Sequence, residues 1–195
     1  MTELLIAAPL RLEAALIRSA TRRVPVHRTG MGPARSRAAA RTLRERPGDA
    51  LLVLGFCGGL DQESVPGEVV VAEEVLAAAD EGHDPQRVDC ADVGALTAAL
   101  SAEGLKVRRG SVVCVSRLAL GERRAELHAG GAIAVDMESV WLSAGAGERP
   151  FGVVRVVLDS PTHELMRPQA AAGAVRAARV LRRVAGALHE WAPGG

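Results

Sequence analysis

The sequence predicts a single α/β domain with a central mixed, largely parallel β-sheet flanked by helices. Short apolar runs of strand length alternate with longer amphipathic stretches along almost the whole chain. The chain of 195 residues suits one domain, and no linker or internal repeat divides residues 1–195. Hydrophobic residues make up 48% of the chain, which is enough to build one core between the sheet and its helices.

The elements follow from the apolar pattern in chain order. Strands are predicted at residues 4–8, 24–27, 51–54, 68–77, 111–115, 132–135 and 151–158. Helices are predicted at residues 9–20, 34–46, 93–102, 121–128 and 168–191. Pro9 is expected as the first helical residue, where its missing N–H costs nothing, and Asp136 is expected to cap a helix after its strand. Residues 79–90, with their Gly, His, Asp and Pro, are expected to form an exposed loop.

Composition and motifs exclude several classes of function. The net charge of +1 gives no support for a nucleic-acid partner. The five histidines lack metal-ligand spacing, so no metal site is expected. Neither a P-loop nor a dinucleotide-binding glycine motif is present, so no cofactor is expected. Three cysteines without CxxC spacing, no signal peptide and no membrane-length apolar run together predict a cytoplasmic location without membrane insertion.

Acidic and glycine-rich features lie where ligands bind open α/β sheets, just beyond the carboxyl ends of strands. The Gly55–Gly59 run, the Met137-Glu138 pair and Asp159 each follow a predicted strand, and Glu13 lies one turn into the helix after the first strand. If these strands are parallel, all four features share one edge of the sheet.

Each feature also has a purely structural interpretation. The glycine run suits a tight turn, and Glu138 suits a helix start, where an acid is stabilised by the helix dipole. Asp159 before Ser160 suits a turn, although an acid beside apolar residues can also act as a proton donor. Glu13 is expected to be exposed, and Arg155 is expected to pair with a carboxylate inside the structure.

Four motifs, in this order and spacing, resemble the nucleoside phosphorylase/nucleosidase superfamily. They are Gly55-Phe56-Cys57-Gly58-Gly59-Leu60, Val65-Pro66-Gly67-Glu68-Val69-Val70-Val71-Ala72, Ala134-Val135-Asp136-Met137-Glu138-Ser139 and Arg155-Val156-Val157-Leu158-Asp159. The similarity covers residues from about 4 to 185. The superfamily includes purine nucleoside phosphorylases and methylthioadenosine/S-adenosylhomocysteine nucleosidases. Residues 136–139 and 115–118 are most similar to the hopanoid-associated branch, whose members remove adenine from adenosylhopane.

The resemblance implies a role for each matched residue. Glu138 would bind the ribose hydroxyls, with Met137 against the sugar, and Asp159 would protonate or hydrogen-bond N7 of the purine. Glu13 matches the acid that activates water. The substrate-binding backbone would come from a run of four residues, Gly55, Phe56, Cys57 and Gly58.

The chain also departs from the family pattern. Where an aromatic residue usually stacks on the base, this sequence has the segment 117–120. Base recognition is therefore expected to depend on an aliphatic contact from Leu118 or on a cation over the ring. Use of phosphate would need a cationic anchor, for which Arg35 and Arg117 are the candidates, together with Arg11.

The resemblance implies an enzyme that cleaves the N-glycosidic bond of an adenine nucleoside with an apolar 5′ substituent, by attack of phosphate or water on C1′. A methylthioadenosine/S-adenosylhomocysteine nucleosidase and a futalosine-type hydrolase are the alternatives. A non-catalytic nucleoside-binding protein is a further alternative, against which the three acids Glu13, Glu138 and Asp159 argue. The family also implies a homo-oligomer, and the apolar pair Trp141-Leu142 suits either its interface or the core.

Overall fold

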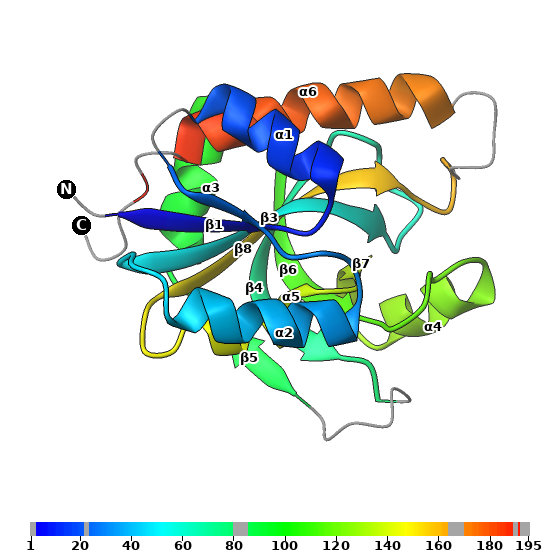
Figure 1. The fold of residues 1–195 in the computed structure, drawn as a ribbon. Helices are drawn as coiled ribbons and strands as arrows, with labels where there is room; N and C mark the ends of the chain where they lie inside the picture. Colours follow the sequence, from blue (N-terminus) through cyan, green and yellow to red (C-terminus); the bar gives the residue numbers. More distant parts are fainter. Residues whose placement is uncertain (1–2, 22–23, 80–85, 164–169, 189–190, 192–195) are drawn as a thin grey trace.

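The computed structural model describes residues 3–21, 24–79, 86–163, 170–188 and 191. Its strands are β1 (Leu4–Ala8), β2 (Val26–Arg28), β3 (Ala50–Gly59), β4 (Val69–Ala77), β5 (Arg87–Asp89), β6 (Val107–Cys114), β7 (Ala132–Asp136) and β8 (Phe151–Asp159). Its helices are α1 (Arg11–Ala20), α2 (Pro33–Arg44), α3 (Val93–Ala102), α4 (Glu122–Ala129), α5 (Ser139–Leu142), the 3₁₀ turn η1 (Ser143–Gly145) and α6 (Ala170–Leu188). Figure 1 shows a mixed sheet flanked by helices, which confirms the predicted fold class.

The sheet closes on itself through β8, which pairs with both β3 and β4. The strands β3, β7, β6, β4 and β8 therefore form a ring, from which β1 and β2 extend beside β3 and β5 extends beside β4. The strands β1, β3 and β8 are mutually parallel, whereas β7 is antiparallel to β3. The expectation that all the features lie beyond parallel strands is therefore wrong for β7, whose carboxyl end points back toward the middle of β3.

The run Gly55–Gly59 is the second half of β3 and not a loop. The prediction of a loop fails because β8 continues to pair with β3 along this run, and β7 pairs with its last two residues. A register shift between Cys57 and Gly58 interrupts the pairing with β8. Such bulges re-aim the strand and are frequent beside functional sites.

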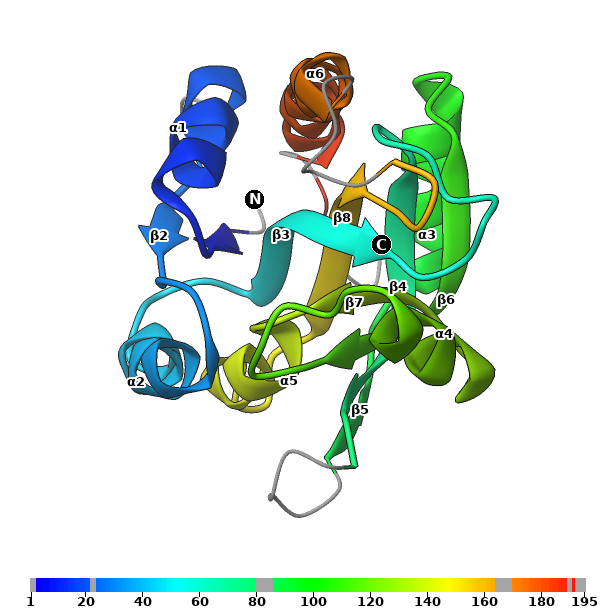
Figure 2. The ribbon, with the colours of Figure 1, turned by 90° about the vertical axis from the view of Figure 1, so that its right-hand side faces the viewer.

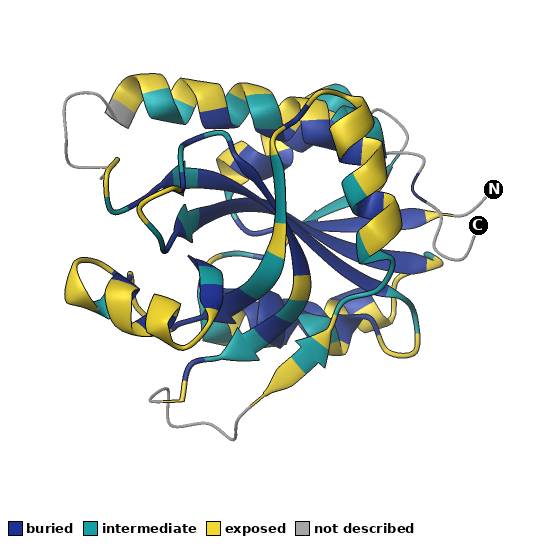
Figure 3. Cartoon of the chain, turned by 180° about the vertical axis from the view of Figure 1, so that it is seen from behind, coloured by how far each residue is buried: buried dark blue, intermediate teal, exposed yellow. Residues whose placement is uncertain are grey.

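Helices cover both faces of the sheet (Figures 1 and 2). Side chains of α1, α3 and α6 pack with one face of β1 and β3, and side chains of α2 and α5 pack with the other. Alternate residues of the strands supply the two cores, as the two-residue period of a strand requires. Figure 3 shows this arrangement as buried strands beneath helices whose outer faces are exposed.

Several boundaries differ from the prediction. Helix α1 begins at Arg11, two residues after Pro9, because the backbone of Leu10 is still extended at the N-cap position. The expected loop at 79–90 contains the short strand β5, while its residues 80–85 lie outside the described part. The start of the predicted last helix, at 168–169, also lies outside it. In the described part of the chain, no helix is both long enough and apolar enough to span a bilayer.

Candidate active site

Glu13 is buried against the middle of β3, with 1% of its surface exposed. Its Oε1 accepts a hydrogen bond from the Phe56 backbone N–H at 2.7 Å, and its Oε2 accepts one from Leu10 at 2.6 Å. Gly55 allows this approach, since a Cβ there would lie 2.5 Å from Glu13 Oε1. The expected exposed position is therefore wrong. Burial raises the pKa of Glu13, opposed in part by Arg155 and by the two backbone N–H groups.

Glu138 lies just after β7, with 5% of its surface exposed. Its Oε1 accepts the Gly32 N–H at 3.2 Å, and its Oε2 lies 3.6 Å from Arg155 Nη2. Gly32 precedes α2 with φ of 89°, a conformation that favours glycine. Burial raises the pKa of Glu138 to about 7, against the attraction of Arg155. This carboxyl group therefore titrates near neutral pH.

Arg155 is fully buried on β8. It lies beside Glu138 and beside Asp136, the last residue of β7. Its Nη2 lies 2.6 Å from Asp136 Oδ2 and donates to Ser139 Oγ at 2.9 Å. Its Nη1 donates to the Phe56 carbonyl at 3.4 Å. The structure thus places Arg155 in a buried ion pair, as its position in an apolar strand predicted.

Asp136 holds the turn between β7 and α5. Its Oδ1 accepts the backbone N–H groups of Glu138 at 3.1 Å and Ser139 at 3.2 Å. The same oxygen accepts from Cys114 Sγ at 2.8 Å. The sequence predicts Asp136 as the cap of the helix, but the N-cap residue of α5 is Glu138, two positions later. Burial opposes ionisation, but Arg155 and these hydrogen bonds hold the pKa of Asp136 below its ordinary value.

Asp159, the last residue of β8, lies apart from Glu13 and Glu138. Its carboxylate pairs with Arg124, a buried arginine of α4. Arg124 Nη2 lies 2.5 Å from Asp159 Oδ2, and only 3% and 6% of the two side chains are exposed. Gly58 lies directly against this pair, since a Cβ there would be 3.2 Å from Arg124 Nη2 and 3.3 Å from Asp159 Oδ1. The interpretation of Asp159 as a plain turn residue does not fit this buried ion pair.

A narrow cavity adjoins the Asp159–Arg124 pair. Its lining includes Leu118 and Met137, as well as Gly58. The enclosed volume is about 40 Å³, far below the roughly 300–1,000 Å³ that ligand pockets usually offer. Leu118 is 62% exposed at this cavity. A bound nucleoside would therefore require the lining side chains to move aside.

The turn after β7 joins the two places. Met137 lines the cavity beside Asp159, and the next residue, Glu138, lies beside Gly32 and Arg155. Phe56 and Cys57 of β3 lie between the two places, and their side chains point away from both. The side chains of Phe56 and Cys57 pack into the two opposite cores, and burial raises the pKa of the Cys57 thiol. Cys57 is thus a protonated core residue and is not poised as a nucleophile.

A larger groove of about 680 Å³ lies at the starts of α1 and α2. Three arginines line it, Arg11, Arg28 and Arg35, together with the exposed apolar side chains of Leu12 and Met31. Two of the candidate phosphate anchors therefore lie together here. The third, Arg117, is exposed elsewhere and lines neither this groove nor the cavity at Asp159.

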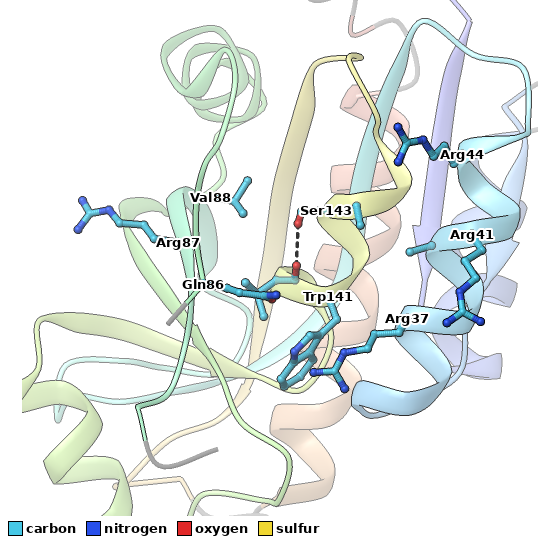
Figure 4. A pocket seen from close by; sticks show the side chains of 11 residues that line it. Arg37, Arg41, Arg44, Gln86, Arg87, Val88, Trp141 and Ser143 are labelled. Carbon is cyan, nitrogen blue, oxygen red and sulfur yellow. Dashed lines mark hydrogen bonds between the residues drawn. The ribbon is translucent and has the colours of Figure 1, made fainter. Parts of the chain in front are cut away.

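Another cavity lies between α2, β5 and α5, away from these acids (Figure 4). Arg37 lies over the Trp141 ring there, 5.3 Å from its centroid. Trp141 and Leu142 are 2% and 0% exposed, which supports a core position for this pair. None of the site residues predicted from the sequence lines this cavity. Among the described residues, no group of three potential metal ligands is found.

A family model, described as the phosphorylase superfamily, matches residues 11–186 of the chain. The chain belongs to the phosphorylase superfamily. A search of the curated proteins finds no match.

Solved structures show how closely the fold of this phosphorylase-superfamily chain follows known ones. The 5′-methylthioadenosine/S-adenosyl homocysteine nucleosidase of Campylobacter jejuni has a TM-score of 0.79 at 13% identity, covering 95% of this chain and 99% of that one. The futalosine hydrolase of Helicobacter pylori has a TM-score of 0.79 at 14% identity, covering 96% and 97%. The Neisseria meningitidis nucleosidase, in complex with methylthio-immucillin-A, has a TM-score of 0.79 at 21% identity, covering 98% and 100%.

Sequence reasoning missed two residues that line the groove and the cavity of this phosphorylase-superfamily chain. Arg124 lies in an amphipathic helix where an arginine is normally solvated, and Arg28 lies at the end of a three-residue strand. The partners of Arg124, Gly59 and Asp159, are far away in the sequence. Arg28 lies in a groove lined by the nearby starts of α1 and α2, but its strand carries no pattern that marks it.

Proposed function

We propose that this chain cleaves the N-glycosidic bond of an adenine nucleoside with an apolar 5′ substituent, such as adenosylhopane, and releases adenine. One observation carries the proposal. Three acids are buried around the second half of β3. Glu13 accepts the N–H of Phe56, Asp159 pairs with Gly58, and Glu138 lies beside Arg155, the β8 residue that pairs with Gly55. Burying a carboxyl group is costly, and here the cost is offset by backbone N–H groups at Glu13 and by arginines at Glu138 and Asp159.

On the sugar side, Glu138 would accept hydrogen bonds from the ribose hydroxyls in its ionised form. Negative charge from Glu138 beside the sugar would stabilise the ribosyl cation that develops as the C1′–N9 bond breaks. The Gly32 N–H and Arg155 orient this carboxyl group. Because its pKa is about 7, the proposal requires catalysis to increase as the pH rises through neutrality.

On the base side, the electron pair of the broken bond enters the purine ring. Asp159 would act in its protonated form and donate its proton or a hydrogen bond to N7, so that the base leaves more readily. The carboxylate left by proton transfer would pair with Arg124. Support for this placement comes from the cavity, where Asp159, Met137 and Leu118 meet. The aliphatic Leu118 would contact the ring where the family usually has an aromatic side chain.

Two nucleophiles are compatible with the arrangement. Glu13 has a raised pKa and would take a proton from an attacking water. The groove with Arg11, Arg28 and Arg35 would bind phosphate, because guanidinium groups pair well with phosphate oxygens. The dependence of the rate on phosphate separates the two.

The apolar 5′ substituent is supported by the same groove. Leu12 and Met31 are 58% and 48% exposed on its lining, although large apolar side chains are normally buried. Met31 precedes Gly32, whose N–H contacts Glu138. An apolar group extending from the sugar side would cover these two side chains.

The test is release of free adenine from adenosine, methylthioadenosine and a 5′-alkyl-adenosine, each with and without phosphate. The proposal expects the 5′-alkyl compound to give the highest kcat/KM. Methylthioadenosine is the second candidate, favoured by the nucleosidases of similar fold, and futalosine is included as a third compound. If none of these compounds releases its base, the proposal is overturned.

Two variants test the roles of the acids. Asp159→Asn should lower kcat by roughly 10²–10⁴-fold, the usual contribution of a positioned acid or base, with the fold retained. Asp89→Asn is the matched control, since Asp89 is exposed on β5. Near-normal turnover in Asp159→Asn would contradict its assignment.

A further inference from the structure

Arg124 makes three hydrogen bonds in three directions from a buried position. Its Nε donates to the Ala119 carbonyl at 2.9 Å, its Nη1 to the Gly59 carbonyl at 3.2 Å, and its Nη2 to Asp159 Oδ2 at 2.5 Å. The residue is 2% exposed. One guanidinium group therefore forms hydrogen bonds with the segment before α4, the end of β3 and the end of β8.

These three segments surround the cavity at Asp159. Leu118, next to Ala119, lines it from one side, and Gly58, next to Gly59, lines it from another. The planar guanidinium group has a fixed geometry, so it sets the distance between these segments. Arg124 itself also lines the cavity.

We propose that Arg124 is a positioning residue for the reaction: it fixes the Asp159 carboxyl group relative to the backbone at Gly59 and Ala119, so that this group stays in place while the side chains lining the cavity move aside for substrate. This inference rests on the proposed function. Through Arg124, helix α4 would contribute to catalysis by holding Asp159.

The competing explanation is that Arg124 only stabilises the fold. A buried carboxylate needs a partner, and Arg124 supplies it. A structural role predicts lower stability with unchanged kcat in the folded protein. A positioning role predicts loss of kcat in protein that remains folded, because displacement of a catalytic group by about 1 Å costs about 10²-fold in rate.

The experiment compares Arg124→Ala, Arg124→Lys and Arg123→Ala in the full chain. Purine release is measured on the best substrate of the wild type, and circular dichroism confirms folding. Arg123, on the same helix, pairs with Glu126 at the surface and serves as the control. We expect kcat of Arg124→Ala to fall about 10²-fold, with a much smaller change in KM.

Arg124→Lys keeps the charge, but its compact ammonium group lacks the planar guanidinium geometry by which Arg124 reaches three separate segments, so we expect it to lose kcat as well. It also keeps the test decisive if Arg124→Ala does not fold. Free guanidinium ion, at millimolar non-denaturing concentrations, should restore part of the kcat of Arg124→Ala, whereas methylammonium should not. Restored rate in protein that was already folded is not expected from a structural role.

A double variant shows whether Arg124 acts through Asp159. If it does, adding Arg124→Ala to Asp159→Asn causes little further loss. Independent, multiplicative losses would overturn the inference, as would normal kcat in both Arg124→Lys and Arg124→Ala. A wild type that cleaves no nucleoside overturns the proposed function and this inference together. Loss in Asp159→Asn without loss in the Arg124 variants overturns this inference alone.

Discussion

Replacing Glu138 by glutamine should stabilise the protein at alkaline pH while lowering its activity. The folded protein holds the proton of Glu138 more tightly than the unfolded chain, because burial raises its pKa from 4.5 to about 7. The stability that this group contributes is therefore greatest below pH 4.5 and is lost as the pH rises through about 7. Glutamine has no charge to bury, so the variant escapes this loss.

The magnitude follows from the same values. The rise from 4.5 to about 7, at about 1.4 kcal/mol per pKa unit, corresponds to about 3 kcal/mol in the free energy of unfolding above neutral pH. For a chain of this size, that raises Tm by roughly 6–12 °C. Arg155 keeps its ion pair with Asp136 in the variant, at 2.6 Å. The substitution therefore leaves no unpaired buried cation to offset the gain.

The assay is thermal unfolding of wild type and Glu138→Gln across a series from about pH 5 to about pH 8, where linkage predicts a growing difference. Glu63→Gln is the control, since Glu63 is exposed and its carboxylate makes no contact within the described part of the chain. Activity should fall by about 10–100-fold, the equivalent of losing a charged hydrogen bond to the ribose. An equal or lower Tm at pH 8, or a difference that does not vary with pH, would refute the reasoning.

Two further substitutions test the packing around the acids. Asp136→Asn should lower the free energy of unfolding by about 3–5 kcal/mol, because it removes the 2.6 Å partner of the buried Arg155; a loss below 1 kcal/mol in urea titrations would contradict the ion pair. Gly55→Ala should cost about 1–3 kcal/mol and displace Glu13, since the added Cβ would lie 2.5 Å from its carboxylate. Gly94→Ala is the matched control, because nothing lies within 4 Å of a Cβ there, and equal stability of the two alanine variants would exclude the proposed clash.

Much of the fold could be predicted because it is encoded locally. Helix α3 has the predicted bounds, Val93–Ala102, and β1 has its predicted bounds, Leu4–Ala8. Helix α3 buries Leu96 and Leu100, which are spaced as the 3.6-residue period of a helix requires. Strand β1 is a continuous apolar run of strand length that is buried on both faces. The sequence also identified Asp159 and Glu138 as distinctive, through their places at strand ends and through motif order.

The burial and the partners of these acids were decided only by the tertiary structure. Glu13 lies on a helix whose pattern suggests exposure, yet the N–H of Phe56, 43 positions away, and the missing side chain of Gly55 make room for it. Arg124 and Asp159 are 35 positions apart, and they meet where α4, which packs against β7, comes close to the end of β8. Local periodicity specifies which face of an element is apolar, but a buried charge is stable only beside a partner, and that partner comes from wherever the closed sheet brings the chain together.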